Sequence, residues 1–97
     1  MEIKTKTQPF LKKTQPSVYL VTLIYDKYVS WEFCMRVLTT VFHKSDEEAA
    51  LIAENILSEG EGICGAYIFE IAETKAVTVE TLANKESFSL HCLLEEI

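Results

Sequence analysis

The stretch that decides the fold runs from Gly62 to Ala76 and reads GICGAYIFEIAETKA. Its first half, Ile63–Phe69, is rich in β-branched and aromatic residues and is typical of a strand. Its second half, from about Ala72, has the apolar spacing of a helix. No loop residues separate the two halves, so we expect a strand that passes directly into a helix and makes a rigid corner. Such a corner can present polar and charged side chains to a binding partner. Here these side chains are Glu70, Glu73, Thr74 and Lys75.

The segments on either side of this corner complete the predicted order. Val18–Tyr25 reads as a largely buried strand, and Leu90–Leu94 as a short one. Ser30 is a candidate N-cap for a first helix, and Ser45 with Glu48 forms a capping box for a second. Apolar stripes at helical spacing follow both caps: Cys34, Val37, Leu38 and Val41, then Ala49, Ile52, Ala53 and Ile56. The predicted fold is a single α+β domain in the order β-α-α-β-α-β, with a three-stranded sheet packed against three helices.

Charge divides the chain into two parts. Residues 1–16 carry a net charge of +3 and both prolines, and we expect a flexible N-terminal extension there. Residues 17–97 form the expected folded domain and carry −9, which argues against a nucleic-acid partner. No apolar run is long enough to span a membrane, and residues 1–4 do not begin a secretory signal. A cytoplasmic protein with no membrane partner is the expectation.

The reactive residue types form no catalytic or metal-binding motif. The chain has three cysteines, an odd number: Cys34, Cys64 and Cys92. They form no C-x-x-C pair and lie in apolar runs, which is typical of buried reduced thiols. Cys34 and His43 could imitate a nucleophile and its base, but nine residues along one helix point them about 180° apart. We therefore expect no enzyme, no metal and no cofactor. A small thiol or metal-binding protein remains the alternative from a different class.

The corner motif resembles that of ClpS, the adaptor that brings substrates to the ClpA unfoldase of the Clp protease. Ile63-Cys64-Gly65 followed by Glu70-Ile71-Ala72-Glu73-Thr74-Lys75 is similar to the family's I-C-G and E-x-A-E-T-K signature. The resemblance covers roughly Pro16 to Glu95. Other positions support the same register: Pro16, Ser17, Tyr19, Glu32, Phe33, Val37, Leu38, Leu90 and Cys92.

The resemblance implies a docking role for two charged residues. The family's glutamate and lysine at the positions of Glu70 and Lys75 contact the N-terminal domain of the unfoldase, and both residue types are present here. An exposed pair of opposite charges on a rigid corner suits this role, because rim charges set register and specificity. Residues 1–16 match in character the family's extension, which engages the unfoldase pore. From the residues alone, Glu70, Glu73 and Lys75 also fit ordinary solvated helix-end charges.

The resemblance also implies a pocket for bulky N-terminal residues of substrate proteins, and here the sequence departs from the family. Tyr25 stands where the family has an asparagine that accepts from the substrate's α-amino group, and Leu57 aligns with an assisting histidine. Lys27 replaces an aspartate, and Trp31 replaces a gating methionine. The full set of corresponding positions is Tyr25, Asp26, Lys27, Val29, Trp31, Cys34, Ala53, Ile56, Leu57 and Leu90.

These changes predict altered substrate recognition. A protonated amine that enters a concave site needs acceptors in place of its lost water. Each lost hydrogen bond to a charged group costs about 1.5–3 kcal/mol, so two losses weaken binding by roughly a few hundredfold or more. The expected function is an adaptor that docks on the N-terminal domain of a ClpA-type unfoldase and influences N-degron selection, with substrate N-termini as a second partner. The alternative within this class is a regulator of the unfoldase that binds no degron.

Overall fold

The structure of the protein is a computed structural model that describes residues 17–97. The expected extension, residues 1–16, lies outside the described residues. The order β-α-α-β-α-β and the α+β class are confirmed. The elements are β1 (Val18–Tyr25), α3 (Trp31–Thr40), α4 (Asp46–Glu59), β2 (Glu61–Ile68), α5 (Phe69–Lys85) and β3 (Leu90–Glu96).

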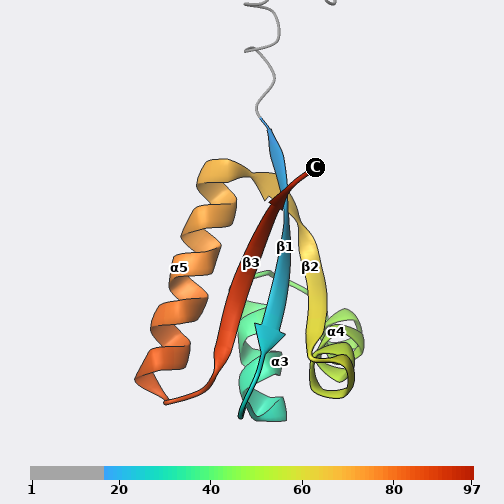
Figure 1. The fold of residues 1–97 in the computed structure, drawn as a ribbon. Coiled ribbons are helices and arrows are strands. Elements are labelled where there is room, and N and C mark those ends of the chain that lie inside the picture. Colours follow the sequence, from blue (N-terminus) through green and yellow to red (C-terminus); the bar gives the residue numbers. More distant parts are fainter. Residues whose placement is uncertain (1–16) are drawn as a thin grey trace, which may run out of the picture.

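The three strands form one antiparallel sheet in the order β2-β1-β3 (Figure 1). In the view of Figure 1 the strands lie in front, α3 and α4 lie behind them, and α5 runs along the side of β3. Buried residues of all three helices join the core, among them Phe33 of α3, Ile56 of α4 and Val79 of α5. The helices therefore pack against one face of the sheet, as the sequence predicts.

Side chains alternate between the two faces of the sheet, as in any pleated strand. Val21 and Leu23 of β1 and Leu90 of β3 point into the core and are fully buried. The opposite face of the sheet, which we call the open face, is covered by no element of residues 17–97. Its positions follow from the strand register: Leu20, Thr22 and Ile24 of β1, Ile63 and Ala66 of β2, and His91, Leu93 and Glu95 of β3.

Both predicted helix caps are confirmed. The hydroxyl of Ser30 accepts from the backbone N–H of Phe33 at 3.1 Å and starts α3. The hydroxyl of Ser45 accepts from the N–H of Glu48, also at 3.1 Å, and starts α4. Each bond satisfies one of the donors that a helix leaves free in its first turn.

The element boundaries differ from the predicted ones by up to three residues. β2 begins at Glu61 and ends at Ile68, and α5 begins at Phe69 rather than near Ala72. The strand does pass directly into the helix, as expected. The earlier start of α5 brings the ring of Phe69 edge-on to Tyr19, with the ring centroids 5.2 Å apart. β3 continues to Glu96, because its last residues still pair with the start of β1.

Two glycines of the quoted stretch are required by packing and by backbone geometry. A Cβ at Gly62 would lie 2.8 Å from Cγ1 of Ile56, so a glycine lets α4 approach β2 closely. Gly65 has a φ of 153° and lies beside a shift of register in the β1–β2 pairing, where a β-bulge suits glycine.

Candidate functional site

The corner between β2 and α5 presents a polar and apolar surface. We call Phe69, Glu70, Ile71, Glu73 and Thr74 the docking corner; all five are exposed. The N-cap of α5, Ile68, provides no side-chain hydrogen bond to the first turn of the helix. Glu70 in that turn places a carboxylate beside the positive end of the helix dipole. The docking corner therefore combines a favourably placed carboxylate with large exposed apolar groups.

Lys75 does not belong to this exposed surface. Its ammonium donates a hydrogen bond to the backbone carbonyl of Val41 at 2.6 Å, and it lies 5.7 Å and 5.2 Å from the ring centroids of Phe42 and Tyr67. Of the expected Glu70–Lys75 pair, Glu70 is exposed and Lys75 is half-buried, and whether either residue contacts an unfoldase stays a prediction. Val41 is the C-cap of α3, where unpaired carbonyls and the negative end of the dipole attract a cation. The two aromatic rings add cation–π attraction.

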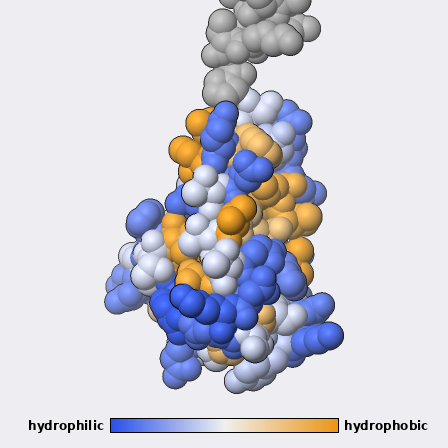
Figure 2. Space-filling view, turned by 90° about the vertical axis from the view of Figure 1, so that its left-hand side faces the viewer, coloured by the Kyte–Doolittle hydropathy of each residue, from blue (hydrophilic) through white to orange (hydrophobic). Residues whose placement is uncertain are grey.

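Exposed apolar side chains accompany the exposed carboxylate of Glu70 on α5. Phe69 and Ile71 are 42% and 46% exposed, and Val77, further along α5, is 59% exposed. Figure 2 views the molecule from the side of α5 and shows apolar side chains mainly in its upper half, toward the start of that helix. A protein interface commonly combines such apolar groups with a few charges that fix register.

The positions of the family's substrate pocket meet at the other end of the sheet, but many of them belong to the core. Cys34, Ala53, Ile56 and Leu90 are fully buried, and Val29 is 6% exposed. These five side chains belong to the hydrophobic core and leave almost no surface that a ligand could contact.

The remaining pocket positions form a rim. Asp26, Lys27 and Trp31 are exposed, and Tyr25 and Leu57 are half-buried against the core. The backbone N–H of Tyr25 donates to the carbonyl of Gly60 at 3.0 Å, which holds the end of β1 against the end of α4. The structure thus brings the strand end and the second helix together, as the resemblance implies.

Several contacts of this rim could not be found from sequence. The carboxylate of Asp26 accepts from the hydroxyl of Ser89, and this bond lowers the pKa of Asp26. Tyr28 lies against Phe88, with ring centroids 5.5 Å apart, and Phe88 lies against Phe33 at 4.7 Å. The partners are about 55 to 63 residues apart in the chain, and no local pattern marks them.

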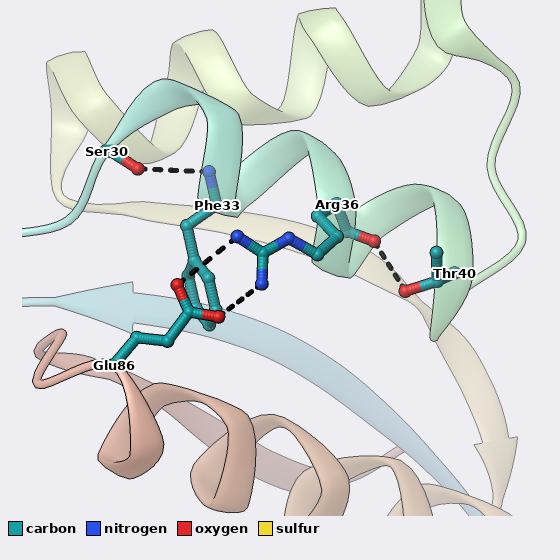
Figure 3. A network of polar contacts seen from close by, with 5 residues as sticks. All are labelled: Ser30, Phe33, Arg36, Thr40 and Glu86. Carbon is teal, nitrogen blue, oxygen red and sulfur yellow. Dashed lines mark hydrogen bonds and ion pairs between the residues drawn. The ribbon is translucent and has the colours of Figure 1, made fainter.

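An ion pair ties the helix that carries Trp31 to the end of α5. Figure 3 shows Glu86 reaching from the end of α5 to the guanidinium of Arg36 on α3. The second of its two hydrogen bonds, Nη2 to Oε1, measures 3.3 Å, and the guanidinium lies 5.2 Å from the ring centroid of Phe33. The bond from Arg36 lowers the pKa of Glu86. The contact links α3 to the end of α5 at the surface of the protein.

A shallow open groove of about 360 Å³ lies at a different place, between the end of α4 and the start of β2. Its lining residues are Asn55, Glu59, Glu61, Gly62 and Ile63. None of them belongs to the predicted pocket positions.

The cysteine thiols are poor nucleophiles in this environment. Burial raises the pKa of Cys34 to about 11 and those of Cys64 and Cys92 to about 12. A reactive thiol needs a lowered pKa. Among residues 17–97, His, Cys, Asp and Glu side chains form no group of three that could hold a metal ion. The same range contains no helix that is both long and apolar enough to cross a membrane.

Comparison with known proteins places this fold in the class of proteolytic adaptors. The family model described as ATP-dependent Clp protease adaptor protein ClpS matches residues 14–93. The ClpS adapter of Maricaulis maris is 42% identical over 94 residues, covering 97% of this chain and 84% of that protein. The ClpS adapter of Nautilia profundicola is 35% identical and covers all of both chains.

A solved structure agrees with the sequence relatives. Agrobacterium tumefaciens ClpS2 bound to L-phenylalaninamide superposes with a TM-score of 0.79 at 29% identity, covering 86% of this chain and all of that one. The chain therefore belongs to the ClpS family of Clp protease adaptors. Members of this family are adapters rather than proteases themselves.

Proposed function

We propose that this protein is an adaptor that docks on the N-terminal domain of a ClpA-type AAA+ unfoldase and influences which substrates are degraded. Membership of the ClpS family supports the general role. The observation that carries the docking site is the exposed carboxylate of Glu70, set between exposed Phe69 and Ile71 at the rigid start of α5. Because an ATP-dependent unfoldase works where ATP is abundant, the proposal places the adaptor in the cytoplasm.

Lys75 contributes to docking indirectly in this proposal. Its ammonium is bound to Val41 and two aromatic rings, so it positions the first turns of α5 against the end of α3. The direct contacts then come from the docking corner, and Lys75 acts as a positioning residue.

Binding of the full chain to a purified unfoldase N-terminal domain tests the docking site. We expect Glu70→Arg to weaken binding, because it reverses a charge that is exposed at the proposed interface. Glu54→Arg is a matched control: it makes the same change of charge at an exposed position on α4. If both variants fold correctly and bind the N-terminal domain equally well, the docking corner is not the binding site for the unfoldase.

We further propose that recognition of bulky N-terminal residues is weakened in this chain. The solved structure of the related Agrobacterium tumefaciens ClpS2 has L-phenylalaninamide bound. The rim here offers Tyr25, Leu57 and Lys27 at positions where the family has asparagine, histidine and aspartate. An incoming ammonium would thus meet fewer acceptors and an added positive charge. Calorimetric titration with phenylalaninamide tests this proposal, and low-micromolar binding would refute it.

A regulator that occupies the unfoldase without binding a degron remains the second candidate. It is favoured by the burial of Cys34, Ala53, Ile56 and Leu90, which leaves four pocket positions inside the core. A peptide library that yields no binder, together with intact docking, would support this candidate over the first.

A further inference from the structure

The open face of the sheet has an unusually apolar centre. Ile63 is 58% exposed and Leu93 is 43% exposed, and they flank Thr22 from the two neighbouring strands. Leu20 and Ile24 lie in the adjacent rows of the same face, both half-buried. In an antiparallel sheet with one solvated face, polar residues ordinarily occupy such positions. Neighbouring exposed apolar side chains on a sheet can serve as a contact surface for another chain segment.

Acidic residues stand at the edges of this apolar centre. Glu61 is paired in register with Ile24, and Glu95 with Leu20, so each carboxylate lies at the side of an apolar row. Figure 2 shows the open face from its edge, along the right-hand side, where apolar side chains gather. A segment that carries both apolar and basic residues would complement this surface in both respects.

The shallow groove extends the same surface past the edge of β2. Ile63 belongs both to the open face and to the lining of the groove, where Glu59 and Glu61 add two carboxylates. On the other side of the sheet, a carboxylate oxygen of Glu80 lies 3.4 Å from the backbone N of Cys92 and accepts from it, so α5 occupies the edge of β3. The approach from the side of β2 is therefore the open one.

Residues 1–16 have the matching chemistry. This segment carries +3 against −9 on residues 17–97, and its sequence Phe10-Leu11-Lys12-Lys13 sets two apolar side chains beside two lysines. It joins the described chain at Ser17, directly before Val18, which is 38% exposed. The neighbouring Ile97, whose N–H donates to the carbonyl of Val18, is 75% exposed. The segment thus enters the structure at the apolar end of the open face.

The segment is also long enough. Phe10 precedes Ser17 by seven residues, which span at most about 25 Å when extended. The row of Ile63, Thr22 and Leu93 lies four residues along β1 from Val18, about 13 Å at the rise of a strand. Phe10 and Leu11 can therefore reach the centre of the open face with slack for a reversal of chain direction.

From these observations we infer that the open face is an intramolecular docking site for residues 1–16, with Phe10 and Leu11 on Ile63 and Leu93 and the lysines beside Glu61 and Glu95. The contact is weak and reversible, because ordering a chain segment costs conformational entropy that a small apolar contact barely offsets. Its electrostatic part weakens as salt is added. This site is distinct from the docking corner and does not depend on the proposed adaptor function.

Paramagnetic labelling of the full chain tests the inference. A nitroxide is attached at Thr7→Cys; the raised pKa values of Cys34, Cys64 and Cys92 slow their reaction near neutral pH, and the wild-type chain treated in the same way shows any label that they take up. We expect loss of methyl signal intensity at Leu20, Ile63 and Leu93 in NMR spectra. Leu51, 65% exposed on α4, is the internal reference and should keep its intensity.

Two further samples make the test decisive. The double change Phe10→Ser and Leu11→Ser, with the same label, should restore the intensities at Ile63 and Leu93, because it removes the apolar anchor. Equal loss at Leu51, or loss that survives the double change, overturns the inference. In a mixture of spin-labelled chains and separate methyl-labelled chains, the intensities should not change, whereas a loss would assign the site to a second copy and also overturn it.

Discussion

At the scale of single residues, the ammonium of Lys75 makes its polar contact within its own chain and can stabilise the fold. It satisfies a carbonyl at the C-terminal end of α3, a position that otherwise needs water or a cap. Lys and Met have similar helix propensities, so Lys75→Met removes the hydrogen bond with little other change. We expect it to lower the free energy of unfolding by about 1.5 kcal/mol, the lower end for a bond to a charged group, since the side chain is only partly buried.

Urea denaturation measures this difference, and Glu70→Gln is the control. Glu70 is exposed and lies on the same helix, so this substitution should leave the free energy of unfolding within about 0.5 kcal/mol of the wild type. If Lys75→Met proved as stable as Glu70→Gln, the contact with Val41 would contribute nothing to the free energy of unfolding. Lys75 would then be available to bind the unfoldase directly.

The cysteines give a second prediction at this scale. Burial raises the pKa of Cys34 to about 11 from a usual value of 9.0, so the folded state holds its proton more tightly than the unfolded state does. This contribution to stability is fully present below pH 9.0 and is lost as the pH rises toward 11. The native protein should therefore react slowly with a thiol-specific disulfide reagent near pH 8, and fast after unfolding in urea. Fast reaction of three thiols in the native state would favour the thiol-protein alternative instead.

At the scale of elements, the ion pair between α3 and the end of α5 gives a pH dependence. The bond from Arg36 lowers the pKa of Glu86 below its usual value of 4.5. Its stabilising effect is therefore present above pH 4.5 and is lost as the pH falls through the lowered pKa. NMR titration of the Glu86 carboxyl carbon should give a midpoint below 4.5 in the wild type. Arg36→Met should return the midpoint to the usual value, and an unchanged midpoint in this variant would contradict the pairing.

Most elements of this fold could be predicted because their signals are local. Ser30 and Ser45 each bind an N–H three residues away, and the apolar stripes of α3 and α4 repeat within one helix. The helical periodicity places the start of α5 three residues late, because Phe69 in its first turn packs against a residue distant in the chain, Tyr19. The local periodicity of the sequence does not reveal such a contact.

The site was less predictable for the same reason. The partners of Lys75, Asp26 and Arg36 are 34, 63 and 50 residues away in the chain. The resemblance implies a role for Lys75 and Asp26, but no local pattern shows that their side chains have partners inside the molecule, and nothing in the sequence marks Arg36. That distinction separates Glu70, which is exposed, from Lys75, which is not.

At the scale of the whole molecule, the two candidate surfaces lie at opposite ends. The docking corner lies at the start of α5, at the top of Figure 1, and Tyr25 ends β1 at the bottom. Helix α3 runs between them: Trp31 begins it, and Val41, which binds Lys75, caps its end. Its ten residues span about 15 Å. If an unfoldase binds the docking corner as proposed, the rim at the other end stays accessible to a substrate.

This arrangement makes substrate recognition separable from docking, and a gain of function can test it. Tyr25 and Leu57 are half-buried side chains on the two elements that the bond from Tyr25 to Gly60 holds together. The double substitution Tyr25→Asn and Leu57→His would supply two acceptors for a protonated α-amine at the family's positions. Each hydrogen bond to a charged group is worth about 1.5–3 kcal/mol, so binding of phenylalaninamide should tighten by at least about tenfold for each.

Calorimetric titration measures this gain, and Tyr25→Asn with Leu51→His is the matched control. Leu51 lies on α4 as Leu57 does, but it is 65% exposed and outside the rim, so its histidine should add nothing. Binding of the unfoldase N-terminal domain should be the same for both variants, because the docking corner is unchanged. If the Leu57→His pair bound phenylalaninamide no better than the control, missing acceptors would not be what limits recognition. The buried positions Cys34 and Ala53, which close the core beneath the rim, would then be the barrier to a bulky N-terminal side chain.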